Sequence, residues 1–370
     1  MPIALKWLHR NPRIAFGLLA ALLAVLPFLV EAGLGRGWVR VLDFALLYAM
    51  LALGLNIVVG YAGLLDLGYV AFYALGAYLF AWLGSPHFGL HLPFWLVLPL
   101  GAMLAGMFGV LLGAPTLRLR GDYLAIVTLG FGEIIRIFLN NLNAPVNITN
   151  GPQGINLIDP VSLGGLSLGS SVKLAGVGFS SPHLYYYLFL ALTLATIFVA
   201  LRLQDSRIGR AWAAIREDEV AAAAMGINTR NIKLLAFAMG AMFGGLAGGL
   251  FAAFQGFISP ESFNLMESIM ILCMIVLGGM GNIPGVILGA VLLTVLPEAL
   301  RYVGDWQRAV LGHVAVDPND LRMLLFGLAM VLMMLYRPAG LIPSRQRKRE
   351  FAAEESVAEQ EQASLYDAKA

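Results

Sequence analysis

The chain has 370 residues, of which 59% are hydrophobic and only 12% charged, and its mean hydropathy is +0.79. A soluble domain is closer to half apolar and a quarter charged, so this composition indicates an integral membrane protein. The net charge of +2 and the lack of basic runs interleaved with aromatic residues argue against a nucleic-acid partner, and a single cysteine excludes an internal disulfide.

Apolar windows follow one another along most of the chain, and each is a candidate for crossing about 30 Å of hydrocarbon. Two windows are shorter than the roughly 17 residues that a full crossing needs. The first window follows basic residues and could be a signal peptide, but no convincing cleavage site follows it. We therefore predict an all-α, polytopic membrane protein with about ten transmembrane or re-entrant helices, at residues 14–30, 41–60, 67–84, 93–114, 122–140, 183–203, 232–257, 266–278, 285–302 and 321–337.

The distribution of basic residues predicts how the chain is oriented. If the N-terminus is cytoplasmic, most of the 24 lysines and arginines fall in cytoplasmic segments, and the C-terminus is cytoplasmic too. This orientation divides the chain into a transmembrane domain over 1–340 and a cytoplasmic tail over 341–370. It makes residues 141–182, rich in Asn, Gly, Pro and Ser, an external loop of turns and short elements, and residues 204–231 a cytoplasmic loop.

Two glycine-rich stretches interrupt the apolar pattern, "VVGYAGLLDLG" at 58–68 and "VLGGMGNIPG" at 276–285. Irregular backbone in a membrane is tolerated where protein buries it or where it lines a wet cavity, and transporters use such broken segments beside their substrate path. Three positions coincide when the stretches are aligned without gaps, which hints at an internal repeat. We predict that these stretches line the translocation pathway, through Gly60, Gly63, Asp66, Gly279 and Asn282.

Ionisable residues within the apolar segments are functional candidates because hydrocarbon makes them costly. Glu133 and Arg136 are three residues apart on one predicted helix and can neutralise each other, or they can contact substrate in the pathway. Mutual pairing is the favoured interpretation. The glycines Gly240, Gly244 and Gly248 lie one helical turn apart, which predicts a strip where another helix backbone packs closely.

The stretch "RIGRAWAAIREDEVAAAAMGIN" at 207–228 is too polar for lipid. Asp205 or Ser206 can cap a first short helix, and Asp218 can cap a second one that Gly226 ends. The first helix carries an apolar stripe that includes Trp212 and Ile215. A Trp-centred face surrounded by charges suits a groove on another cytosolic protein. Alternatively, the loop lies against the helices of its own chain or against the membrane surface.

This loop resembles the "EAA" loop by which permease subunits of ABC importers dock their ATPases, although the spacing from Glu219 to Gly226 is one residue longer. Other stretches, including "GYAGLLDLGYVAFYALGAY" at 60–78, "NGPQGI" at 150–155 and "VLGGMGNIPGVILGA" at 276–290, are similar to the LivM-type permease of branched-chain amino-acid ABC transporters. Where we would expect serine and histidine in the first stretch, the chain has Asp66 and Tyr69, so the substrate stays open.

The resemblance implies a permease subunit in a bacterial cytoplasmic membrane that is not itself an enzyme and binds no cofactor. It implies a heterodimer with a sister permease, two cytosolic ATPases that bind ATP and Mg, an extracytoplasmic solute-binding protein, and an aliphatic amino acid as the substrate. The residues that would couple to the ATPase are Arg210, Trp212, Ile215, Arg216, Glu217, Asp218, Glu219 and Gly226. The alternative is a stand-alone secondary transporter or channel driven by an ion gradient, which would explain the hydropathy equally well.

Overall fold

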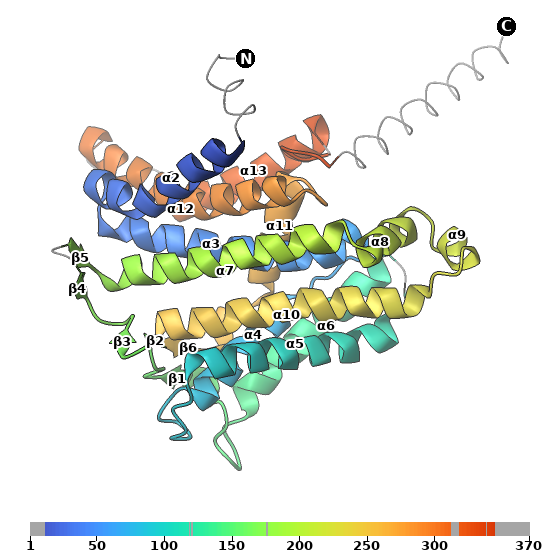
Figure 1. Ribbon diagram of the computed structural model, residues 1–370, viewed down its shortest axis with the longest axis horizontal. Helices are drawn as coiled ribbons and strands as arrows, with labels where there is room; N and C mark the ends of the chain where they lie inside the picture. The colour runs from blue at the N-terminus through green and yellow to red at the C-terminus, as the bar shows by residue number, and fades with distance from the viewer. Residues whose placement is uncertain are drawn as a thin grey trace, which may run out of the picture.

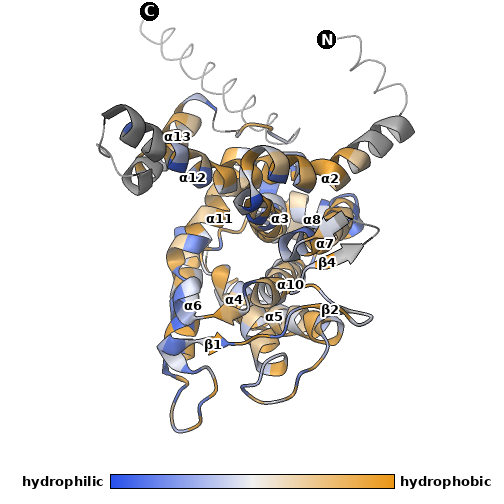
Figure 2. Ribbon diagram, turned by 90° about the vertical axis from the view of Figure 1, so that its left-hand side faces the viewer, coloured by the Kyte–Doolittle hydropathy of each residue, from blue (hydrophilic) through white to orange (hydrophobic). Residues whose placement is uncertain are grey.

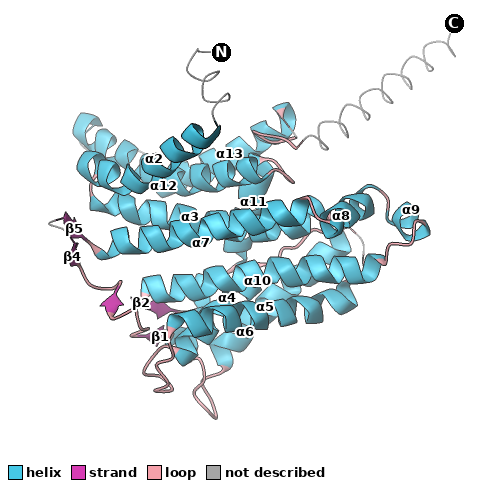
Figure 3. Cartoon of the chain, in the orientation of Figure 1, coloured by secondary structure: helices cyan, strands magenta, loops and turns pink. Residues whose placement is uncertain are grey.

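The computed structural model is a bundle of helices with short strands at one end (Figures 1 and 3). It describes residues 12–117, 119, 121–174, 177–311, 318–337 and 339–344. In chain order, the elements are α2 (Pro12–Leu34), α3 (Arg36–Asn56), the π-helical turn η1 (Ile57–Tyr61), α4 (Val70–Leu83), α5 (Phe94–Thr116), α6 (Asp122–Asn141), η2 (Gly151–Gln153), β1 (Ile155–Asn156), β2 (Ser162–Leu163), β3 (Leu166–Ser167), β4 (Val172–Leu174), β5 (Val177–Phe179), α7 (Ser181–Gln204), α8 (Arg207–Glu217), α9 (Glu219–Ala224), α10 (Thr229–Gln255), β6 (Phe257–Ile258), η3 (Pro260–Ser262), α11 (Leu265–Gly278), α12 (Ile283–Leu311) and α13 (Pro318–Tyr336).

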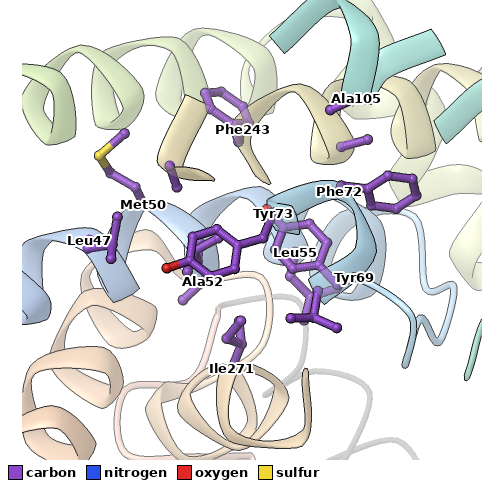
Figure 4. Close-up of a cluster of buried hydrophobic side chains, with 14 of the residues drawn as sticks. Leu47, Met50, Ala52, Leu55, Tyr69, Phe72, Tyr73, Ala105, Phe243 and Ile271 are labelled. Atoms are coloured by element: carbon purple, nitrogen blue, oxygen red, sulfur yellow. The ribbon is translucent and has the colours of Figure 1, made fainter. Parts of the chain in front are cut away.

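Helices α3 and α10 form the centre of the bundle. Helix α10 packs against α3, α4 and α5, while α3 also packs against α7, α11 and α12. Figure 4 shows buried side chains from α3, α4, α5, α10 and α11 together in one cluster. The core therefore joins the N-terminal and C-terminal halves of the chain.

The predicted glycine strip of α10 is where the backbones of the central helices approach closely. A Cβ on Gly248 would collide with the carbonyl oxygen of Tyr73 in α4, and one on Gly245 would lie 2.7 Å from the carbonyl oxygen of Gly101 in α5. Neighbouring Gly240 lies in the same way against Gly54 of α3. Because lipid gives helices no hydrophobic reason to associate, this close backbone contact is a main source of packing energy.

Large apolar side chains also cover the outer faces of the helices. Figure 2 shows hydrophobic residues along most of the bundle, and α5, α6 and α7 expose Met103, Ile126, Ile134 and Phe198 by more than half. A soluble protein would not expose apolar surface on this scale, whereas a membrane protein presents it to lipid.

Among the residues that the structure describes, six helical stretches are long and apolar enough to cross a membrane: Arg36–Tyr61, Phe94–Thr116, Ser181–Gln204, Thr229–Gln255, Pro260–Gly278 and Ile283–Tyr302. The window at 14–30 lies within α2, of which Ala21–Leu34 was found as a shorter apolar helix, and the window at 67–84 contains the shorter apolar helix Val70–Leu83. Helices α6 and α13 occupy the remaining two windows and are not among the six stretches. The fold class is confirmed as helical and membrane-spanning, while a count of about ten spans is not confirmed.

The two soluble-looking stretches lie at opposite ends of the bundle. In Figure 1 the strands β1–β5 are at the left end, and α8 and α9 are at the right end. Residues 141–182 form turns, η2 and hairpins, as predicted, and β1 pairs with β6 through Ile155 opposite Ile258. This separation is what a protein with loops on two sides of a membrane requires.

Candidate functional site

The polar loop between α7 and α10 forms two short helices, α8 and α9. Ser206 caps α8 by accepting a hydrogen bond from the backbone N–H of Gly209 at 3.1 Å. Asp218 caps α9 by accepting from Val220 and Ala221 at 2.7 and 3.0 Å, and Gly226 follows α9 with φ +85°. We call residues 205–228 the helical loop. Its predicted helix–turn–helix form is confirmed, and Ser206 is the first cap.

The apolar stripe of α8 faces the protein itself. Trp212 is fully buried, and its Nε1 donates to the carbonyl oxygen of Ile232 in α10 at 2.7 Å; Ile215 is buried beside it. In the structure the Trp-centred face therefore packs against its own chain, which is the alternative interpretation, and the coupling role of these two residues stays a prediction. The physical reason is that the stripe buries its apolar area, and satisfies the indole N–H, against α10.

Helix α9 presents the exposed apolar side chains of the loop. Val220 is 69% exposed and Met225 is 84% exposed, and Ala221, Ala223 and Ala224 are exposed between them. We call these five residues the α9 surface. Large apolar residues exposed together at the end of a loop are typical of a protein-interaction site.

An ion pair fixes the start of α9 to α10, and a second contact lies within the helical loop. Glu219 Oε1 lies 2.6 Å from Lys233 Nζ, and Lys233 is itself largely buried in the first turns of α10. At the other end, Arg210 Nη1 donates to the backbone carbonyl of Asp205 at 3.0 Å and stays within the loop. Glu217 lies exposed where α8 ends. Lys233 thus holds α9 in place without covering the α9 surface.

Arg216 points in the opposite direction from α9, toward the first glycine-rich stretch. Its Nη1 donates to the carbonyl oxygen of Gly60 at 2.5 Å. Its alkyl stem lies over Gly63, where an added Cβ would be 2.8 Å from Cγ of Arg216 and where φ is +68°. Glycine is therefore required at 63 for both conformation and space.

Both glycine-rich stretches break their helices, as predicted. The first forms the π-helical turn η1 and then irregular backbone up to α4, and we call residues 57–68 the first turn. The second lies between α11 and α12, and we call residues 279–282 the second turn. A π-helical turn inside an α-helix is rare and occurs often at functional sites.

The two turns are in direct contact. Asn56, buried just before η1, accepts a hydrogen bond from the N–H of Gly281 at 2.9 Å. A Cβ on Gly60 would lie 2.7 Å from the nitrogen of Gly281, so the backbones touch. A polar pocket of about 450 Å³ lies between both turns and α8, and its lining includes Gly60, Gly281, Asn282, Arg210 and Arg216. Three segments that the sequence presents separately thus form one site.

The second turn is also hydrogen-bonded to the segment that follows α13. Asn282 Nδ2 donates to the carbonyl oxygen of Ile342 at 2.9 Å, and the N–H groups of Leu341 and Ile342 donate to carbonyls at the end of α11. Gly279 lies against Ile342 with φ +122°. Residues up to 344 are therefore packed here, across the boundary predicted at 340, and the rest of the predicted tail lies outside the described residues.

The ionisable pathway candidates lie apart from this pocket. Asp66 is buried, and its Oδ1 accepts from the N–H of Gly68 at 2.9 Å, which closes a turn before α4. Glu133 and Arg136 pair within α6, with Nη2 of the arginine 2.9 Å from the carboxylate, and Arg136 also reaches Glu261 at 3.5 Å. The favoured pairing of Glu133 with Arg136 is confirmed.

Sequence reasoning did not find Asn56, Lys233 or residues 341–343. The available signals were weak. Asn56 is an isolated asparagine at the end of an apolar run, and Lys233 is a lysine at the start of one. Within the described residues there is no cluster of three His, Cys, Asp or Glu side chains that could hold a metal ion.

The chain matches the family model described as "Branched-chain amino acid transport system / permease component" over residues 37–334. It is 46% identical over 329 residues to the high-affinity branched-chain amino acid transport system permease protein LivM of Escherichia coli (strain K12), covering 86% of this chain and 72% of the relative. It is 44% identical to the protein of the same name in Salmonella typhimurium, covering 90% of this chain and 76% of the relative.

A more distant relative is the permease protein LivH of Salmonella typhimurium, which is 27% identical over 301 residues and covers 80% of this chain and 91% of the relative. No solved structure matches the chain significantly. The matched residues run from the start of α3 to near the end of α13 and include the helical loop and both glycine-rich turns. The chain therefore belongs to the permease-component family of branched-chain amino acid transport systems, as a LivM-type permease.

Proposed function

We propose that this chain is one of two non-identical membrane subunits of an ATP-driven importer of branched-chain amino acids. The relatives named LivM and LivH support a pair of permeases, because this one chain resembles both. An extracytoplasmic binding protein delivers the amino acid at the end of the bundle that carries β1–β5. ATP and Mg bind to separate ATPase subunits in the cytoplasm, where both termini of this chain also lie.

The observation that carries the ATPase-docking part of the proposal is the α9 surface. It lies at the end of the bundle opposite the strands (Figure 1), and it exposes Val220 and Met225. The helix is held in place by its N-terminal cap and by the ion pair of Glu219 with Lys233. A docking helix has to be rigid with respect to the bundle, since a flexible one would absorb the movement of the ATPase. The α9 surface, not Trp212, is what a partner would contact.

The second part of the proposal concerns the pathway. The polar pocket lies between α8 and the two glycine-rich turns, at the same end of the bundle as the docking surface. Broken helices with irregular backbone suit a gate, because few intrahelical hydrogen bonds must break when they move. We propose that Gly60, Gly63 and Asn282 belong to this gate.

The test changes the α9 surface without disturbing α9. In the variant Val220→Asp with Met225→Lys, each new charge lies at the helix end that its sign favours, so α9 keeps its form. We expect the purified chain to lose its ATPase subunits and the cells to lose leucine uptake. The matched control is Leu157→Asp, which charges a side chain that is 77% exposed in the loop at the opposite end. Unchanged ATPase binding in the double variant would show that the α9 surface is not the docking site.

A further inference from the structure

Arg216 lies where the helical loop meets the membrane-embedded part of the chain. Its guanidinium bonds the carbonyl of Gly60 at 2.5 Å, and its stem covers Gly63. A hydrogen bond of this length is lost when its atoms separate by about 1 Å. Any displacement of α8 by that amount must therefore either break the contact or carry the first turn with it.

The first turn is joined to the second in the same manner. Asn56 accepts from the N–H of Gly281 at 2.9 Å, and Gly60 contacts Asn56 and Gly281 too closely to leave room for a methyl group. The second turn separates α11 from α12, so a shift at Gly281 reaches both helices. Arg216, Gly60, Asn56 and Gly281 thus form a continuous series of contacts from the loop to two broken helices.

The π-helical turn is the part of this series whose hydrogen-bond pattern could change by one residue. In η1 the N–H of Ala62 donates to the carbonyl of Ile57, one residue further back than in an α-helix. Moving this bond by one residue would turn the segment into an α-helix and rotate the residues that follow. A discrete change of this kind is what couples a small shift at one site to a larger one elsewhere.

We propose that Arg216 is a positioning residue that transmits movement of α8 to the two glycine-rich turns, while α9 alone makes the docking contact. This inference rests on the proposed function and divides the helical loop into two roles. It assigns Arg216 to the inside of the permease, although its neighbours in sequence, Glu217 and Val220, are exposed.

The test uses the whole transporter, purified with its co-eluting subunits and placed in proteoliposomes, with radiolabelled leucine as the probe. The measured quantity is the amount of leucine transported per ATP hydrolysed. For Arg216→Ala we expect the ATPases to co-elute as in the wild type and the ratio to fall about tenfold. Arg216→Lys should retain part of the ratio, because an ammonium can still donate to Gly60 but cannot present a planar fork of donors.

The matched control is Arg202→Ala. Arg202 is an exposed arginine at the same end of the bundle, and it lies over the ring of Phe198 instead of contacting either turn. We expect this variant to keep the wild-type ratio. A second comparison adds Asn56→Ser, which weakens the link between the turns. If the contacts act in series, the double variant loses no more coupling than the more severe single variant.

Each contrary result has its own meaning. If Arg216→Ala transports as much leucine per ATP as the wild type, the inference is overturned. If the double variant loses the product of the two single losses, the two contacts act separately and not in series. Loss of the ATPases from a well-folded Arg216→Ala chain makes Arg216 a docking residue, which also overturns the inference but leaves the proposed function standing. A wild-type chain that elutes without any ATPase removes the proposed function itself.

Discussion

At the scale of single residues, Trp212 decides which surface of the helical loop is free for other proteins. Its indole is fully buried and donates to the carbonyl of Ile232, so it fixes α8 against α10. The charged residues around Trp212 therefore surround a contact between α8 and α10 of the same chain. We therefore expect Trp212 to act in coupling by holding α8 in position, without touching a partner.

Substitution of Trp212 should lower stability more than it alters docking directly. Trp212→Ala removes a large buried side chain and should destabilise the fold by about 3–5 kcal/mol, while Trp212→Phe loses one hydrogen bond worth about 1 kcal/mol. The measurement is the apparent Tm of the purified chain in detergent. Trp95→Phe is the matched control, because Trp95 is 45% exposed, and an equal fall in Tm for both phenylalanine variants would contradict this role.

A second prediction at the scale of single residues concerns the ion pair between Lys233 and Glu219. Lys233→Glu places two carboxylates together and leaves a charge in a largely buried position, so α9 should loosen and ATPase binding should weaken. Adding Glu219→Lys restores opposite charges with the positions exchanged. We expect this swap to recover part of the co-eluting ATPase, and a swap no better than Lys233→Glu alone would show that the ion pair does not position α9.

At the scale of elements, the glycine strip of α10 determines how closely the central helices approach. Gly248→Ala places a methyl group against the carbonyl of Tyr73, so α4 and α10 must separate. We expect a clear fall in the apparent Tm and in the amount of folded chain recovered. Gly130→Ala in α6 is the matched control, because nothing lies within 4 Å of its added Cβ. That change should be neutral or stabilising by about 0.5–1 kcal/mol.

Local elements were largely predictable from the sequence, since their signals are local. Asp218 and Gly226 mark the ends of α9, the glycines of α10 recur at helical spacing, and Glu133 and Arg136 are within reach on one helix. Each needs only a few neighbouring residues to form. The interruptions near Gly60 and Gly281 were also visible, because glycine-rich runs are unusual within long apolar segments.

Contacts between distant elements were not predictable. Asn56 and Gly281 are 225 residues apart, and nothing in either stretch identifies the other as its partner. The apolar stripe of α8 showed which face is buried, but not that α10 is what buries it. Likewise, no periodicity marks Leu341 and Ile342 as the residues that donate to the carbonyls at the end of α11. The site depends on such contacts between distant segments. The sequence therefore identified the segments of the site but not how they contact one another.

At the scale of the whole molecule, the two ends of the helix bundle carry different structures. The strands and hairpins lie at one end of the bundle, and the helical loop, the polar pocket and both glycine-rich turns lie at the other. A transport subunit driven from the cytoplasm needs its docking surface and its movable segments close together. The outer faces of α5, α6 and α7 remain apolar, which suits contact with lipid or with a second membrane subunit.

The central claim is that this LivM-type permease works within an ATP-driven complex. The most direct measurement is to purify the chain, tagged at its C-terminus, from its native membrane in mild detergent and to identify every subunit that co-elutes stoichiometrically. We predict a second permease and two ATP-binding subunits, with leucine transport that requires ATP. A lone chain or homodimer that transports without ATP would contradict the claim and favour a secondary transporter driven by an ion gradient.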